Sequence, residues 1–492
     1  MPSFGWLIPR CSTFDENDIE KIIQTALRIL EKSEWTIDGT AQFMAYLDGF
    51  GCSINEKKVR FPQPVIDKTL ARINAFKASQ PPDSPLNEIR ASTELLYSTS
   101  GQAIYTCDVE TGALRAATTD DLADISRVIN SYERLGRTHP TFIPQDAPLM
   151  TRELHAFITI MLNSDQPYRV SAFSPQIVPF FLEALAIYYG TREKAIEHLL
   201  LPCKVWVNTP FMLAAESIEA AMIVREWTGK PLTYNPMPVV GFATPVTPSG
   251  ALALITAEVI GVNAISLAVD DCLCGWCASP LHFDMKSAID VQWGPEVLII
   301  GTAQTHIASH LFGTKPSVRL MASTRANVPG VQSMTERAFA VGMGLMAGIR
   351  NFGSLSTLAN SDVGSIVQLV MDMELIEAAK YIVRGFDVVP EEMDADFIVE
   401  TANKGARFME TDHTAAHYRK YQWFPELLDR QVPGAWKENP TDMLEKARQV
   451  ALKKIRTAQN KCPLEPYQKK ELMRLLNAAD KELNHNVERI NG

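Results

Sequence analysis

Apolar residues recur with a helical period near the start of the chain, over residues 14–33. They fall three or four positions apart, which predicts an amphipathic helix with one buried face. Asp15 or Asn17 stands where the N-cap of this helix is expected. The region that follows is mixed, and several prolines mark turns and a boundary in it: Pro62, Pro64, Pro81, Pro82 and Pro85.

After residue 100 the pattern changes to short apolar runs, each followed by a stretch with helical spacing. We expect strands in the apolar runs at 103–108, 138–146, 168–173, 205–211, 232–238, 265–276, 317–323 and 348–354. Helical patterns lie between them, for example at 119–135, 214–227, 249–264, 295–312 and 332–347. Eight alternations of strand and helix predict an α/β fold, a (β/α)8 TIM barrel with N-terminal and C-terminal helical additions.

This pattern divides the chain into three expected parts. Residues 1–100 form a helical and mixed extension packed on the barrel, residues 101–404 form the barrel, and residues 405–492 form a charged helical extension outside it. A doubly wound open sheet is the rival architecture, but no G-x-G-x-x-G follows an early strand.

The site of a TIM barrel lies where its strands end, so the residues at these ends are the candidates. They are rich in aromatic and amide side chains: Tyr105, Asp146, Ser171, Asn208, Asn235, Trp276, Ser323, Arg350 and Phe352, with Trp206, Phe211, Tyr234 and Phe283 nearby. An aromatic ring presents a negative face to a cation, which is worth about 0.5–2 kcal/mol per ring when water is excluded. The same rings equally suit a packed barrel core.

Composition narrows the classes of function. The 492 residues are 46% hydrophobic and 21% charged, and the net charge of −10 argues against general nucleic-acid binding. No run of about 18 uncharged apolar residues predicts a membrane span. The N-terminal residues lack the pattern of a signal peptide. Eight cysteines are too few for a disulfide scaffold and suit the cytoplasm.

Candidate acid–base and metal groups are sparse. Most of the nine histidines fall in predicted helices, and His282 is the one expected near the barrel mouth. Asp146 and Asp284 also lie near the mouth, where each either has a functional role or caps a helix or backbone amide. The thiols of CLCGWC (272–277) suggest zinc or an iron–sulfur cluster, but buried cysteines acting as small apolar groups explain the same spacing.

Long stretches of the chain resemble the trimethylamine methyltransferase family, from about residue 14 to residue 485. They are DVETGALRAATTDDLAD (108–124), QDAP (145–148), PMPVVGFATPVTPSGALAL (236–254), FDMKSAI…GPE (283–296), QLVMDMELI (368–376) and METDHTAAHYRKYQWFPELLDR (409–430). The resemblance implies transfer of a methyl group from a methylated amine to the cobalt of a corrinoid protein. It also implies a (β/α)8 barrel, in agreement with the strand count.

Two departures from the family pattern bear on the substrate. The chain has only the twenty standard residues, so it resembles the non-pyrrolysine branch, whose members demethylate quaternary amines such as glycine betaine, proline betaine, carnitine or γ-butyrobetaine. Where the family usually reads D-A-Q-A-G-Y-E-K, this chain reads GVQSMTER (330–337). Gln332 and Glu336 match, Arg337 replaces lysine, and Arg350 or Asn351 follows where many relatives have histidine.

The resemblance implies a reaction without a general acid or a bound metal in this chain. Co(I) of a corrinoid attacks a methyl group of a permanently cationic nitrogen, and the leaving amine is neutral. The expected substrate-binding residues are Tyr105, Asn208, Tyr234, Asn235, Trp276, Phe283, Arg350 and Phe352, with Gln332 and Glu336 in positioning roles. Asp146, His282 and Asp284 are expected on the corrinoid side. Arg350 either anchors a substrate carboxylate or pairs with Glu336 or Asp362.

The expected partner is a small corrinoid-binding protein that carries cobalamin and docks over the barrel mouth. We also expect a homo-oligomer, because the barrel has long helical appendages, and no contact with nucleic acid or membrane. The donor is expected to be glycine betaine or a related betaine. A betaine- or corrinoid-binding barrel without turnover is the alternative from another class.

Overall fold

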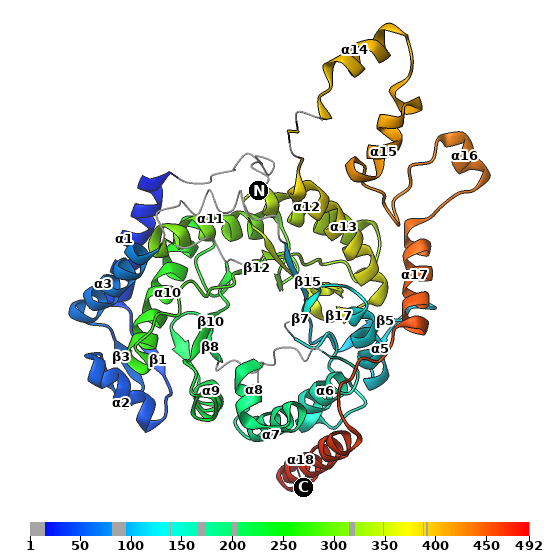
Figure 1. The fold of residues 1–492 in the computed structure, drawn as a ribbon. Coiled ribbons are helices and arrows are strands. Elements are labelled where there is room, and N and C mark those ends of the chain that lie inside the picture. The colour runs from blue at the N-terminus through cyan, green and yellow to red at the C-terminus, as the bar shows by residue number, and fades with distance from the viewer. Residues whose placement is uncertain are drawn as a thin grey trace.

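The computed structural model describes residues 15–80, 95–137, 139–165, 174–198, 204–313, 320–347, 349–386, 388–389 and 392–491 (Figure 1). Its helices are α1 (Glu16–Lys32), α2 (Ala41–Phe50), α3 (Gln63–Ser79), α5 (Thr119–Asn130), α6 (Arg152–Met161), α7 (Val178–Tyr189), α8 (Arg192–His198), α9 (Ala215–Thr228), α10 (Pro248–Asp270), α11 (Pro295–Phe312), α12 (Val331–Met346), α13 (Ile366–Arg384), α14 (Ala395–Asn403), α15 (Asp412–Tyr421), α16 (Pro433–Glu438), α17 (Met443–Thr457) and α18 (Pro466–Asn491).

The strands are short. They are β1 (Trp35–Ile37), β2 (Ser53–Asn55), β3 (Lys58–Arg60), β4 (Leu96–Thr99), β5 (Tyr105–Cys107), β6 (Leu114–Ala116), β7 (Gly136–Arg137), β8 (Lys204–Asn208), β9 (Met212–Leu213), β10 (Thr233–Pro236), β11 (Val239–Val240), β12 (Leu281–Asp284), β13 (Ile289–Val291), β14 (Leu320–Met321), β15 (Asn351–Leu355), β16 (Thr357–Leu358) and β17 (Val363–Gly364).

Helices surround the central strands in a ring (Figure 1). β8 and β10 run parallel in one sheet, and a second sheet has the order β14-β15-β4-β7 with all its pairs parallel. The pairing of β15 with β4 brings a late strand beside an early one, as a barrel requires. The described strands nevertheless form several small sheets and show no closed barrel, so what is established is a mixed α/β fold. The strand expected at 168–173 lies outside the described residues.

The first strand of the central parallel sheet is not the strand that the sequence pattern predicted. The run at 103–108 forms β5, but β5 pairs with β17 and β6 in a separate sheet. The strand that pairs with β15 is β4, which falls inside the region expected to be an N-terminal extension. Hydrophobic pattern identifies a strand but not its neighbour, because strand pairing is decided by contacts distant in the sequence.

The prediction of a strand at 265–276 is wrong. α10 continues through Asp270, and Asp271 ends it in the left-handed region with φ of 50°. Residues 265–269 belong to a part of α10 that is buried on almost all sides, so the run shows neither a clear helical nor a clear strand period. The loop after α10 is held instead by Asn263, whose side-chain amide bonds both the N–H and the carbonyl of Gly275 at 3.0 Å.

Other predicted elements are confirmed. α11 spans the predicted residues, while α9 and α12 begin and end within a residue of prediction. The carboxylate of Asp15 accepts the N–H of Asp18 at 2.8 Å, so Asp15 caps α1. The residues that α1 buries are those of the predicted apolar face: Ile19, Ile22, Ile23, Ala26 and Leu30. Local period and capping chemistry are therefore sufficient for these elements.

The apolar helix α10 forms much of the core. It is long and apolar enough to cross a membrane by composition, but 89% of its most apolar window is buried inside the protein. α1, α2 and α3 pack against it, and Trp35 lies directly over Gly261. Burial by these helices accounts for its hydrophobicity.

The C-terminal region is helical, as expected. α17 packs against α13 and α5, and α18 packs against α7 and α6. Between α13 and α17 the chain leaves the body, and α14, α15 and α16 project from it at the upper right of Figure 1.

Candidate active site

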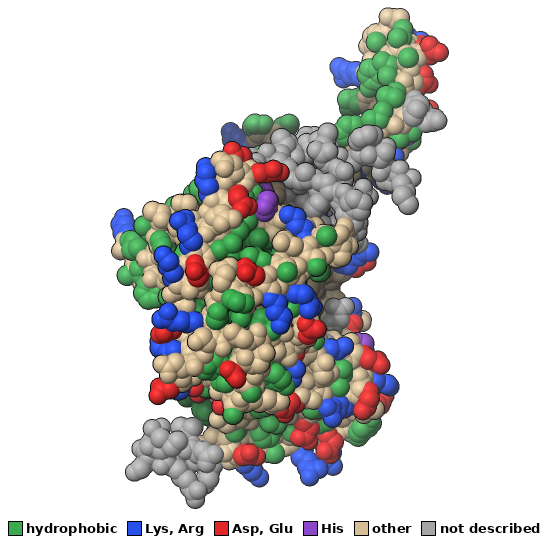
Figure 2. Space-filling view, turned by 90° about the vertical axis from the view of Figure 1, so that its left-hand side faces the viewer, with side chains coloured by type: hydrophobic (Ala, Val, Ile, Leu, Met, Phe, Trp, Pro, Cys, Tyr) green, Lys and Arg blue, Asp and Glu red, His purple; other side chains and the backbone are tan. Residues whose placement is uncertain are grey.

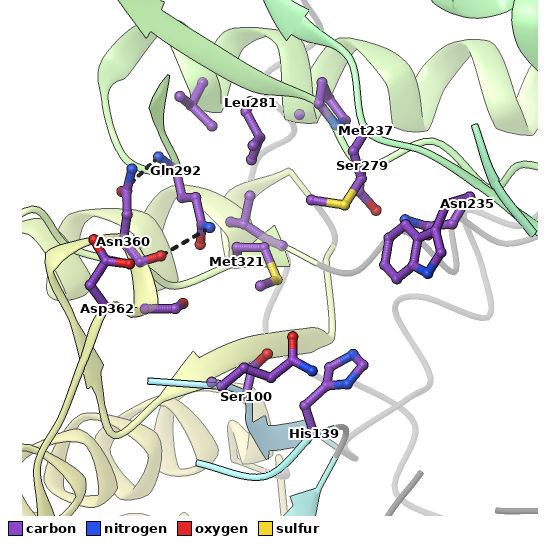
Figure 3. Close-up of a pocket in the computed structure, with 18 of the residues that line it drawn as sticks. Ser100, His139, Asn235, Met237, Ser279, Leu281, Gln292, Met321, Asn360 and Asp362 are labelled. Atoms are coloured by element: carbon purple, nitrogen blue, oxygen red, sulfur yellow. Dashed lines mark hydrogen bonds between the residues drawn. The ribbon is translucent and has the colours of Figure 1, made fainter. Parts of the chain in front are cut away.

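A cavity of about 540 Å³ opens among the carboxyl ends of the central strands (Figure 3). Segments that follow strands form part of its wall: 100–102 after β4, His139 after β7, Met237 after β10, and 360–362. Ser279, Pro280 and Leu281 line it from the start of β12, and Val297, Gly301 and Gln304 line it from α11. This edge is where α/β enzymes with parallel strands bind their ligands.

Strand alternation places three side chains in the cavity. Val205 and Val207 of β8 are buried on the outer face, so Lys204 and Trp206 face inward. Asn235 of β10 stands opposite Trp206 in the parallel register and also faces the cavity. The ammonium of Lys204 lies 4.7 Å from the Trp206 ring centroid, close enough for a cation–π contact.

Asn360 and Gln292 build the opposite wall together (Figure 3). Gln292 donates from its backbone N–H to Asn360 Oδ1 at 3.0 Å and from Nε2 to the Asn360 carbonyl at 3.2 Å. Gln292 Oε1 is buried and has no hydrogen-bond partner among the described residues. An unpaired buried acceptor is costly, so it points to a ligand with a positive charge or a donor.

The backbone that carries Asn360 is strained. Five non-glycine residues between 354 and 361 have positive φ: Ser354 (64°), Ser356 (74°), Ala359 (48°), Asn360 (58°) and Ser361 (88°). Such conformations cost on the order of 1–3 kcal/mol each and persist only where surrounding contacts impose them. Their clustering beside the cavity makes this wall a candidate functional element.

Arg337 and Asp372 supply those contacts from beneath the wall. Arg337 Nη1 donates to the carbonyls of Ala322 at 2.6 Å and Ser354 at 2.9 Å, and Nη2 donates to that of Thr357. Its Nε lies 3.2 Å from Asp372 Oδ1, while Asp372 Oδ2 accepts the Ser356 N–H at 2.7 Å. Burial raises the pKa of the Asp372 carboxyl, and the Arg337 charge opposes that rise.

Asn235 is the predicted substrate-binding residue that lines the cavity. Trp206, which was expected near the mouth, also lines it, and Trp276 supports the wall indirectly. Trp276 Nε1 donates to Oε1 of Gln304 at 3.0 Å, and Gln304 lines the cavity. Trp276 therefore orients a wall residue instead of forming the wall itself. Tyr234 and Phe352 are buried in β10 and β15 and do not line the cavity. Phe352 contacts α12 at Gly344.

Arg350 lies outside the cavity, which corrects its expected place at the mouth. β15 begins at Asn351, so Arg350 precedes the strand and lies at the edge opposite the cavity. Its Nη1 donates to the carbonyls of Leu345 at 3.3 Å and Ile349 at 3.0 Å, and no pair with Glu336 or Asp362 forms. Burial lowers the pKa of Arg350. The charged side chains that do line the described part of the cavity are Lys204 and Asp362.

The other predicted substrate residues lie at the rim or beyond it. Asn208 is exposed at the end of β8, and Tyr105 is exposed on β5 in the separate sheet. Phe283 of β12 packs against Phe242 with ring centroids 5.2 Å apart. None of the three is among the residues that line the cavity.

Asp146, Asp284 and His282, which were expected on the corrinoid side, each lie within hydrogen-bond distance of a nearby backbone group. Asp146 Oδ1 accepts the N–H of Thr119 at 3.0 Å at the start of α5, and Asp284 accepts the N–H of Lys286 at 3.1 Å in a turn. These are the capping roles that the sequence left open. His282 Nδ1 lies 3.2 Å from the Phe283 carbonyl.

Gln332 and Glu336, the two positions that match the family pattern, also bond locally. Gln332 donates to Glu336 Oε1 at 2.9 Å, and Glu336 Oε2 accepts the N–H of Arg325 at 2.9 Å. Glu336, which directly precedes Arg337 in the chain, thus fixes the segment that follows β14.

Sequence analysis missed most of the cavity lining. Lys204 escaped because the predicted strand begins at 205, although Lys204 stands two residues before Trp206 and four before Asn208, on the same face of the strand. His139, Met237 and Gln292 lie in loops, Asn360 lies in a 3-10 turn, Gln304 lies in α11 and Met321 lies in β14, and no periodic pattern marks them as lining residues.

Two of the half-buried thiols after α10 have raised pKa values. The pKa of Cys274 is raised by its hydrogen bond to Cys277 and by burial, and burial raises that of Cys272. Protonated thiols are poor metal ligands. Among the residues that the structure describes, no three His, Cys, Asp or Glu side chains are grouped to hold a metal ion.

Comparison with known proteins identifies the family. The family model described as trimethylamine methyltransferase (MTTB) matches residues 2–483. The trimethylamine methyltransferase MttB of Desulfitobacterium hafniense is 21% identical over 86% of this chain and 85% of that protein. A glycine betaine methyltransferase from a second strain of that species is 20% identical over 90% of this chain and 92% of that protein.

Among solved structures, the monomethylamine methyltransferase MtmB of Methanosarcina barkeri is 12% identical, with a TM-score of 0.43 over 92% of this chain and 96% of that one. Its hydroxylamine complex matches with 11% identity over the same shares of both chains and the same TM-score. The match to the family model over nearly the whole length is decisive: the chain belongs to the trimethylamine methyltransferase family and is a methyltransferase.

Proposed function

We propose that this enzyme transfers a methyl group from a quaternary amine, glycine betaine or a related betaine, to Co(I) of a corrinoid carried by a small partner protein. The observation that carries the proposal is the cavity, which combines an aromatic and thioether lining with one lysine, one carboxylate and an unpaired buried amide oxygen. One of the named relatives, a glycine betaine methyltransferase, supports this class of donor, whereas another is named for trimethylamine.

The cavity offers separate places for the two ends of a betaine. The Trp206 ring, the thioethers of Met237 and Met321 and the Gln292 carbonyl oxygen present electron-rich surfaces that suit a trimethylammonium group. Asp362 adds a negative charge to the same cavity. Lys204 supplies the cation that a substrate carboxylate requires, a role expected of Arg350 from the sequence.

The reaction needs positioning more than proton transfer. The partner's corrinoid supplies the Co(I) nucleophile that takes the methyl group. The bond between the methyl carbon and nitrogen breaks with its electron pair left on nitrogen, so a neutral tertiary amine departs without a proton. The residues of this chain hold the ammonium away from water and aim one methyl group outward. Because the positive charge vanishes during transfer, a strong ion pair at nitrogen would slow the reaction.

The rim of the cavity offers a surface for the partner. Phe242 and Val246, which follow β11, and Met285, which follows β12, are exposed near Phe283, beside the parallel pair of β11 and β12. An exposed apolar group at an active-site rim is typical of a protein docking site. The rim therefore fits a corrinoid protein that places its cofactor over the opening.

The direct test mixes the purified enzyme with reduced cob(I)alamin and a panel of quaternary amines, and records the methylcobalamin spectrum. Glycine betaine or a related betaine is expected to react, while trimethylamine is not. Reaction with trimethylamine and with no quaternary amine would refute the proposal. Carnitine, γ-butyrobetaine and proline betaine in the same panel separate the alternative donors. Binding of a betaine without any methyl transfer would instead support a non-catalytic binding protein.

Lys204→Met tests the anchor. We expect the KM for carboxylate-bearing donors to rise about tenfold or more, because a charge-assisted hydrogen bond is worth about 1.5–3 kcal/mol. Choline, which lacks the carboxylate, should be affected little. Lys194→Met, on exposed α8, is the matched control and should leave both donors unchanged. An equal loss for choline would reject the anchor.

Several broader expectations remain part of the proposal. They are a cytoplasmic location, the absence of nucleic-acid and membrane contacts, and the division at residues 100 and 404. β4 is the exception to that division, because its ladder joins it to the central strands.

A further inference from the structure

A helical arm, residues 392–438, projects from the body of the protein. Figure 1 shows α14, α15 and α16 extending beyond α13 and α17, and Figure 2 shows apolar side chains over the same projection. α15 and α16 bury no residue, and α14 buries only Thr401. Helices of 9, 10 and 6 residues are marginal in water without a packing partner.

The base of the arm is firmly attached. The carboxylate of Glu374 on α13 accepts the N–H groups of Glu426, Leu427 and Leu428 at 3.2, 3.1 and 3.2 Å. Tyr381 of the same helix donates to the Tyr421 carbonyl at 2.6 Å. The arm therefore leaves the body in a defined direction.

The arm also has a small ordered cluster of rings. Phe397 of α14 stacks on His413 of α15 with centroids 5.1 Å apart, and His413 lies 4.5 Å from His417. Phe408 meets Phe397 edge-on at 6.0 Å. This cluster joins α14 to α15 but leaves most apolar side chains of the arm uncovered.

The uncovered apolar surface is larger than a monomer usually exposes. Nine large apolar side chains of the arm are exposed, Met409 by 73% and Val432 by 67%; the others are Met393, Ile398, Val399, Phe408, Phe424, Leu428 and Trp436. At roughly half of about 150 Å² each, they leave about 700 Å² of apolar surface per chain. Two such surfaces facing each other would bury about 1,400 Å², within the range of stable interfaces, whereas the largest patch on a monomer is about 300–600 Å².

The charges of the arm are divided in a way that suits a second copy. Residues 392–412 carry six acidic and two basic side chains, whereas residues 419–438 carry four basic and three acidic ones. A two-fold interface must be complementary to itself. An antiparallel pair of arms satisfies this condition, because the acidic segment of each chain faces the basic segment of the other.

We propose that the arm is a dimerisation element, in which residues 392–438 of two copies pack against each other about a two-fold axis. α14 of one chain lies beside the α15–α16 region of its partner. A second copy is present whenever the chain folds, so it covers the arm permanently. A corrinoid protein that must bind and dissociate in each turnover would leave the apolar surface of the arm exposed whenever it is dissociated.

Light scattering after size exclusion, at micromolar concentration, tests the proposal. The wild-type chain should have twice the mass of one chain or a higher even multiple. Val399→Asp with Met409→Asp should halve that mass, because two charges enter the interface. Met473→Asp, at an exposed apolar position on α18, should leave the mass unchanged. Circular dichroism and the thermal midpoint of the body serve as the folding check, since neither arm residue is buried in the single chain.

Charge reversal tests the two-fold arrangement itself. Asp396→Lys and Lys437→Glu should each weaken self-association at low salt. When the two variant proteins are mixed, a heterodimer should form more tightly than either homodimer, because every reversed charge then meets its opposite. A monomeric wild type, or a mixture that associates no better than its components, would overturn the proposal. A monomeric wild type whose arm variants lose transfer to the corrinoid protein, but not to free cob(I)alamin, would assign the arm to that partner instead.

Discussion

Replacing Arg337 with methionine probes the strained cavity wall most directly. The side chain is 1% exposed, and its guanidinium bonds three backbone carbonyls and Asp372. Arg337→Met leaves the Asp372 carboxylate buried without its counter-charge, which costs about 3–5 kcal/mol. Since domains are stable by about 5–15 kcal/mol, we expect a folded but much weakened protein. Arg337→Lys restores the lysine that the family usually has and should cost less, because one ammonium cannot reach every carbonyl.

Urea unfolding followed by circular dichroism measures the loss of stability, and donor KM measures the effect on the cavity. Arg225→Met is the matched control: Arg225 pairs with the buried carboxylate of Asp270 at 2.7 Å, away from the cavity. Both variants should lose stability. Arg337→Met alone should raise the donor KM, because the Ser354–Ser361 backbone loses its support.

Two outcomes would refute this reasoning. One is a destabilisation by Arg337→Met below about 1 kcal/mol, which would mean that the buried pair is not coupled to the fold. The other is an equal rise of KM in the Arg225 control. As a further check, adding Asp372→Asn to Arg337→Met should recover part of the lost stability, because the uncompensated charge is then removed.

Three further predictions concern stability. Burial raises the pKa of Glu258 to about 7, so the folded state keeps a proton between pH 4.5 and 7 that the unfolded state releases. The free energy of unfolding should therefore fall by up to about 3 kcal/mol as the pH rises through this window. Urea unfolding measured from pH 5 to pH 8 should show a weaker pH dependence for Glu258→Gln than for the wild type. Equal pH dependence in the two proteins would contradict the prediction. Gly261→Ala places a Cβ 2.4 Å from Trp35 Cζ2 and should destabilise by about 1–3 kcal/mol, whereas Gly342→Ala, with nothing within 4 Å, should stabilise slightly in the same thermal melts. Asp15→Ala removes the cap of α1 and should cost about 1 kcal/mol in urea unfolding; no change would show that the cap is dispensable.

The candidate site shows where sequence reasoning stops. Asn235 was found because strand ends were searched, and Trp276 was found as an aromatic residue although it acts through Gln304. Arg350 was misplaced because the strand was expected to begin earlier than Asn351, and a shift of that kind moves a residue from one edge of a sheet to the other. Lys204 was missed for the opposite reason, because its strand was expected to begin at 205, one residue later than it does.

The pattern along the chain was sufficient for α1, α9, α11 and α12, for the family and for the class of reaction, because helical period, capping and long motifs are properties of neighbouring residues. It did not determine that β4 pairs with β15, that α10 continues to Asp270, or that Arg337 supports the cavity wall. These features depend on contacts between residues far apart in sequence, and only the tertiary structure brings such residues together.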